Sequence, residues 1–134
     1  VQTCALPISL QSIWPHTFST DRLEQRARDL YDHASGAGVL LLVLAVVVGA
    51  PIVEELVYRG LLQGSVTRGR RPWLGVIGIA ALFALIHFQP VEILGLFTIG
   101  LVLGACALFT RRLGLGVVAH MAFNATGLLM VARG

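Results

Sequence analysis

The chain has 134 residues, of which 56% are apolar and only 13% are charged, and its mean hydropathy is +0.81. This composition exceeds what one soluble core needs and favours a lipid bilayer as the surroundings of the chain. The net charge of +3 comes from arginines in short groups between apolar runs, which disfavours a nucleic-acid-binding protein because no single basic face results.

The first 35 residues are not expected to carry chemistry. Residues 1–8, VQTCALPI, look like a sequencing-adapter primer translated in frame, so we expect the natural sequence to begin near Ser9, partway into a gene. Within residues 9–35, a polar and helix-prone stretch favours an interfacial, amphipathic helix ahead of the first membrane span. The functional core is therefore predicted to lie in residues 36–134.

Four apolar runs occupy this core, and they are best explained as helical membrane spans. They cover about residues 36–66, 73–88, 93–109 and 115–131. The first would be roughly 45 Å long as a helix, against a hydrocarbon thickness of about 30 Å, so it must tilt, bend at Pro51 or extend into the interface. The predicted fold class is all-α, a polytopic transmembrane helical bundle with about four spans in this fragment.

Two arginine-rich turns set the predicted topology. They lie at residues 68–72 and at Arg111-Arg112, two spans apart, and the turn between them has no basic residue. The positive-inside rule makes both turns cytoplasmic. Because the chain has no lysine, its composition is also typical of a GC-rich bacterial genome, so we expect a multi-pass protein of the inner (cytoplasmic) membrane.

The first candidate site residues are Glu54, Glu55 and Arg59, which form an EExxxR pattern inside the first apolar run. Charged groups inside a span are costly, so those that remain there are functional candidates. Glu55 and Arg59 are four residues apart and can pair on one helical face. Glu54 points elsewhere and is left to another partner. Because adjacent buried carboxylates repel each other, at least one of the two is expected to be tuned as a general base requires. The alternative is a charged stretch where the helix leaves the membrane.

Two later patterns place further polar groups inside spans. Phe83 and His87 share one face of the second span, and His120 and Asn124 share one face of the fourth. Taken alone, either histidine could be hydrogen-bonded to a neighbouring helix, and Asn124 could hold two helices together. Taken with EExxxR, the patterns predict one polar site inside the bundle.

Depth counting tests whether these groups can meet. Counted from the turn at 68–72, Glu54 lies ~20 Å along its helix and His87 lies ~21 to 22 Å along the next, so the two can meet. His120 is only about 8 residues from Arg112, or roughly 12 Å, so it reaches that level only if its helix tilts or the turn dips into the bilayer.

The ordered motifs EExxxR, FxxxH and HxxxN resemble the CPBP family of CAAX proteases and bacteriocin-processing enzymes, also called the Abi or type II CAAX prenyl endopeptidase family. Gly100 and Gly104, placed between Phe97 and an Arg-Arg-Leu-Gly turn, add to a resemblance that covers roughly residues 40–128. It implies an intramembrane endopeptidase for membrane-associated or leader-type peptides. Members usually have further spans before the EExxxR helix, which we expect to be missing upstream of this fragment.

The resemblance also implies a role for each motif residue. Glu54 would be the general base, with His87 as its partner in positioning the water. His120 and Asn124 would polarise the carbonyl or stabilise the oxyanion, while Glu55 and Arg59 would be a structural and electrostatic pair holding the site.

The cofactor requirement stays open at this point. Glu54, His87 and His120 could form a catalytic zinc site with one position left for water. The chain has no HExxH motif, and these ligands would come from three separate helices, which favours a mechanism without a metal.

Two rival functions would use the same residues. A non-catalytic immunity or adaptor protein of the same family would keep the motifs for packing and would bind a partner protein. A proton-coupled transporter fragment would use Glu54, Glu55 and His87 as a relay. For the protease reading, the expected partners are the lipid bilayer and a peptide or membrane-protein substrate, and no nucleic acid.

Overall fold

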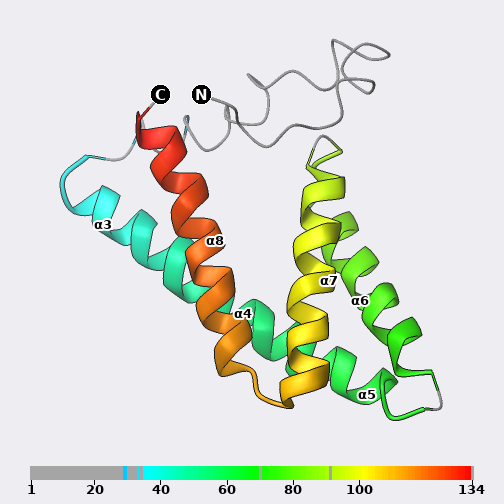
Figure 1. The fold of residues 1–134 in the computed structure, drawn as a ribbon. Helices are drawn as coiled ribbons and strands as arrows, with labels where there is room; N and C mark the ends of the chain where they lie inside the picture. Colours follow the sequence, from blue (N-terminus) through cyan, green and yellow to red (C-terminus); the bar gives the residue numbers. More distant parts are fainter. Residues whose placement is uncertain (1–28, 30–32, 34, 70, 91, 134) are drawn as a thin grey trace.

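The computed structural model describes residues 29, 33, 35–69, 71–90 and 92–133, and from residue 37 onward these form four helical segments (Figure 1). The predictions for residues 1–8 and for most of 9–35 lie outside the described residues. The first segment joins α3 (Ala37–Val43), η1 (Leu44–Gly49), α4 (Ala50–Glu54), η2 (Glu55–Gln63) and α5 (Gly64–Val66), and the other three are α6 (Pro72–Ile86), α7 (Ile93–Thr110) and α8 (Gly114–Arg133). The predicted all-α class is confirmed, and each predicted run agrees with a helical segment to within two residues.

The first segment is one continuous helix of 30 residues, Ala37–Val66, with π-helical winding in η1 and η2. Pro51 lacks a backbone N–H, and its ring would crowd the preceding turn of a regular α-helix. The wider winding of η1 comes just before Pro51, so the chain continues through the proline as a helix. The long helix runs obliquely across α8 and α7 (Figure 1).

Among the described residues, two helices are long and apolar enough to cross a bilayer. They are Ala37–Val66 and Ile93–Thr110, with hydropathies of 2.5 and 2.3. Only 6% and 22% of their most apolar windows are buried inside the structure. The core helix of a soluble protein would be mostly buried, so this exposure indicates lipid-facing surfaces. Pro72–Ile86 and Gly114–Met130 are shorter apolar helices.

The turns lie at opposite ends of the bundle. The turn after α5 and the turn at residues 111–113 are at one end, whereas the turn between α6 and α7 is at the other (Figure 1). α7 ends at Thr110, because Arg111 after it adopts a left-handed φ of 53° and stops the helix. The two arginine-rich turns therefore share one end, as the count of two helices between them predicts.

α6 and α7 approach each other closely at a small-residue contact. A Cβ added at Gly100 of α7 would lie 3.2 Å from both Cα and Cβ of Ala80 on α6. Such close approach is typical of membrane helices, whose association depends on van der Waals packing at small residues. The small-residue contact at Gly100 thus positions α7 against α6.

Replacing Gly100 with alanine should destabilise the bundle by about 1–3 kcal/mol, the usual cost of overpacking a tight contact. The atoms in the way belong partly to the backbone of α6 and cannot rotate aside. Gly95→Ala on the same helix is the matched control, because nothing lies within 4 Å of its added Cβ. Denaturant titration of the purified protein in micelles measures both variants. Equal stability of the two would contradict the close contact.

Candidate functional site

Glu55 and Arg59 form a buried ion pair on η2, as their spacing predicts. Arg59 Nη1 donates to Glu55 Oε1 at 2.8 Å, and neither side chain has exposed surface. Arg59 Nη2 also donates to the carbonyl oxygen of Gly100 on α7 at 3.3 Å. Burying either charge alone would cost free energy, and the opposite charge of the partner offsets that cost. The bond from Arg59 to Gly100 also connects η2 to α7.

His120 on α8 lies between the two adjacent glutamates. Its Nδ1 is 3.0 Å from Glu55 Oε1, and its Nε2 is 3.6 Å from Glu54 Oε2. The residue is only 3% exposed. Because Glu55 is the carboxylate partner of Arg59, its bond to His120 requires the proton on Nδ1. That bond fixes the ring so that Nε2 faces Glu54.

The sequence left the depth of His120 unexplained, and the oblique course of the long helix accounts for it. The long helix runs obliquely to α8 (Figure 1). A helix that crosses the bundle at an angle descends less per residue than the count along it suggests. Gly116, one turn before His120, leaves the space that this approach needs. A Cβ there would be 2.9 Å from Glu55 Oε2.

Glu54 is the more accessible of the two carboxylates. Its side chain is 27% exposed, whereas that of Glu55 is fully buried. Glu54 Oε2 is itself buried and has no hydrogen-bond partner. The 3.6 Å separation from His120 Nε2 is too long for a direct hydrogen bond, so this carboxylate oxygen keeps its capacity to accept one.

Phe83 on α6 lies among the aromatic and cationic groups of the site. Its ring centroid is 4.6 Å from that of His87 and 5.8 Å from that of His120. The guanidinium carbon of Arg59 lies 4.7 Å from the same ring, and Tyr58 packs edge-on at 5.2 Å. Phe83 is 1% exposed, so its ring closes the interior behind the polar groups and adds a cation–π contact to Arg59.

His87 lies at the end of α6 and not within the helix, because α6 ends at Ile86 and Phe88 adopts a left-handed φ of 50°. Its Nδ1 is 2.6 Å from the Phe83 carbonyl oxygen, which makes Nδ1 the donor and leaves Nε2 free. Within the described part of the chain, no hydrogen bond or ion pair joins His87 to Glu54. The expected pairing of these two residues stays a prediction.

Asn124 connects α8 to the long helix. Its Nδ2 donates to the carbonyl oxygen of Val46 in η1 at 2.9 Å. The π-helical winding of η1 interrupts the regular backbone bonding of the helix, and a side-chain amide can bond to a carbonyl there. The role of Asn124 in stabilising an oxyanion stays a prediction, because its amide here holds two helices together.

Gln63 belongs to the same buried row, although the sequence did not single it out. It is 3% exposed, and its Nε2 donates to the carbonyl oxygen of Gly104 at 2.8 Å. Glu55, Arg59 and Gln63 recur every four residues on η2, opposite Gly100 and Gly104 on α7. The continued spacing of four after EExxxR was the signal that could have identified it.

A zinc ion does not fit the described residues in this arrangement. They contain no group of three His, Cys, Asp or Glu side chains that could hold a metal ion. Of the three expected ligands, Glu54 and His120 face each other, but no hydrogen bond or ion pair joins His87 to either glutamate within the described residues. Zinc dependence therefore stays a prediction without a preformed three-ligand site.

Comparison with known families gives a match over more than half of the chain. Residues 36–126 match the model described as type II CAAX prenyl endopeptidase Rce1-like. The matched range contains all six site residues predicted from the sequence, namely Glu54, Glu55, Arg59, His87, His120 and Asn124. Neither a curated protein nor a solved structure matches the chain.

Proposed function

The chain belongs to the Rce1-like family of type II CAAX prenyl endopeptidases, and on that basis we propose that it cleaves peptide bonds within the membrane. The observation that supports this most is the position of His120 between Glu54 and Glu55. One carboxylate is partly accessible and has a free oxygen, while the other is buried and fixes the imidazole. A base and a positioned imidazole at one point are what water activation requires.

Glu54 is the general base of the proposed reaction. It takes one proton from a water whose oxygen attacks the carbonyl carbon of the scissile bond. The Nε2–H of a protonated His120 faces the same position and stabilises the oxyanion that forms. When the carbon–nitrogen bond breaks, the proton passes from Glu54 to the leaving amine, which balances the hydrolysis. The chain's own groups thus supply every proton transfer.

The remaining motif residues position these two groups. Glu55 Oε1 accepts hydrogen bonds from both Arg59 and His120, so the ion pair sets the orientation of the ring. Asn124 holds α8 against the long helix one turn beyond His120. His87, whose Nε2 is free of its own helix, is proposed to contact the water or the substrate from α6.

We further propose a multi-pass protein of the inner (cytoplasmic) membrane with both basic turns on the cytoplasmic side. The shared position of these turns at one end of the bundle supports it (Figure 1). α6 has 15 residues and would span only ~22 Å, so it would cross with its ends in the interface, where Trp73 begins it. The family description suggests a peptide with a prenylated CAAX end, and leader-type peptides are the alternative.

The test uses the full chain reconstituted in phospholipid vesicles with a fluorogenic peptide that ends in a CAAX sequence bearing a farnesyl cysteine. Cleavage is expected, and the same peptide without the farnesyl group shows whether the lipid is recognised. A pH-sensitive dye inside the vesicles tests the rival transporter, which would take up protons without cleavage. Cleavage is expected to survive a metal chelator. A loss that added zinc restores would instead support the zinc mechanism.

The rival adaptor protein is tested in cells. Membranes from cells with the wild-type chain and with Glu54→Gln are compared for membrane proteins that accumulate uncleaved. Accumulation with the variant supports a protease and identifies its substrates. If nothing accumulates and the vesicle assay shows no cleavage, the proposed function is wrong.

A further inference from the structure

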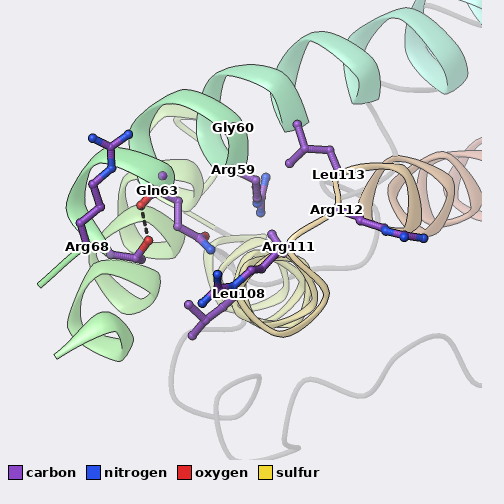
Figure 2. A pocket seen from close by; sticks show the side chains of 11 residues that line it. Arg59, Gly60, Gln63, Arg68, Leu108, Arg111, Arg112 and Leu113 are labelled. Carbon is purple, nitrogen blue, oxygen red and sulfur yellow. Dashed lines mark hydrogen bonds between the residues drawn. The ribbon is translucent and has the colours of Figure 1, made fainter. Parts of the chain in front are cut away.

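A polar cavity lies beside the site, towards the end of the bundle that carries the arginine-rich turns. Its volume is about 540 Å³, and it is lined by η2 and α5 on one side and by the end of α7 and the following turn on the other (Figure 2). Four arginines line it: Arg59, Arg68, Arg111 and Arg112. We call this cavity the basic pocket.

The charge of the basic pocket is uncompensated at its rim. Arg59 is neutralised by Glu55, but Arg68, Arg111 and Arg112 are exposed and form no ion pair with any described residue. None of the described lining residues is acidic. Figure 2 shows Arg111 over the middle of the pocket, with Arg68 and Arg112 on opposite sides. Three exposed guanidinium groups around one opening favour an anion.

The inner wall of the pocket contains buried polar atoms without partners. Arg59 and Gln63 both line it and are each 3% exposed. Arg59 Nε and Gln63 Oε1 make no hydrogen bond within the described structure. Buried polar groups are nearly always paired, so these unpaired atoms make the inner wall of the pocket polar.

The surroundings of the pocket place it at the level of lipid headgroups. Trp73 at the start of α6 and Phe109 at the end of α7 pack with ring centroids 5.4 Å apart, and both are exposed. An exposed tryptophan at a helix end is typical of the membrane–water interface. Leu108 and Leu113 also line the pocket, so the arginines are accompanied by apolar side chains.

We propose that the basic pocket binds the phosphate-bearing headgroup of an anionic phospholipid. The rim arginines bond to the phosphate oxygens, and the leucines contact the glycerol and the start of the acyl chains. A basic pocket between membrane helices on the cytoplasmic side is the arrangement that recognises such headgroups. A lipid source is favoured over a soluble anion because the bilayer supplies headgroups continuously at this depth.

The test is a titration of the purified full chain in neutral detergent with phosphatidylglycerol, in which native mass spectrometry measures the bound lipid. Replacing both Arg111 and Arg112 with Gln should weaken binding about 25-fold, because each arginine contributes about fivefold. Arg71→Gln is the matched control, because Arg71 lies in the neighbouring basic turn but does not line the pocket, and it should change binding less than about twofold. Arg111→Lys, which keeps the charge, should retain most of the binding.

Three outcomes would overturn the proposal. An equal loss from Arg71→Gln would indicate a diffuse attraction of the basic end without a site. Displacement of the lipid by inorganic phosphate at the same concentration would indicate a soluble anion. Displacement by a peptide with a free carboxyl end, but not by its amide, would assign the pocket to the substrate. The readout is binding, so it stands or fails independently of peptide cleavage.

Discussion

Replacing Glu54 with glutamine should lower the kcat for peptide cleavage by about 10²- to 10⁴-fold, the usual contribution of a general base. Glutamine has nearly the same shape but cannot accept the proton of the attacking water. The fold should be retained, because Glu54 is partly exposed and its Oε2 makes no hydrogen bond that the change would break. KM should change little, since the lost interaction acts mainly in the transition state.

The matched control for this variant is Asp29→Asn. It makes the same carboxylate-to-amide change at an exposed position ahead of the first described helix. Its kcat should equal that of the wild type. Separate measurement of kcat and KM in vesicles distinguishes a chemical defect from weaker binding. A folded Glu54→Gln protein that keeps more than about a tenth of the wild-type kcat would remove Glu54 as the base.

The sequence predicts the helices well because their cause is local. Uncharged runs of the length needed to cross a bilayer favour helices wherever backbone groups cannot bond to water. The pairing of Glu55 with Arg59 is equally local, because residues four apart lie on one helical face. Residue spacing alone was enough to predict that pair, and in the structure Arg59 Nη1 lies 2.8 Å from Glu55 Oε1.

The contacts between helices could not be predicted in the same way. Where His120 meets the glutamates depends on the angle at which the long helix crosses α8, and spacing along one helix carries no information on that angle. Asn124 bonds to Val46 because η1 is wound as a π-helix before Pro51. The sequence indicated only a bend at Pro51, as one of three alternatives. Gln63 was not predicted, because an uncharged amide in an apolar run is a weaker indication of a site than a glutamate.

Replacing Glu55 with alanine should destabilise the protein by about 3–5 kcal/mol, the largest stability effect that we expect from one substitution. The change leaves the Arg59 guanidinium buried with only the Gly100 carbonyl as a partner, and His120 loses the acceptor for its Nδ1. Water inside the bundle cannot replace the counter-ion of a buried charge. Denaturant titration in micelles measures the loss.

The double variant Glu55→Ala with Arg59→Met distinguishes the contribution of the ion pair to stability from its role in positioning His120. Replacing both charges by apolar groups should recover most of the lost stability, because the penalty comes from the unpaired charge and not from a missing attraction. Cleavage should not recover, since no group would then hold His120 towards Glu54. If the double variant were as unstable as Glu55→Ala alone, the penalty would lie in packing against Glu55. Recovery of full activity would show that His120 does not need Glu55 for its orientation.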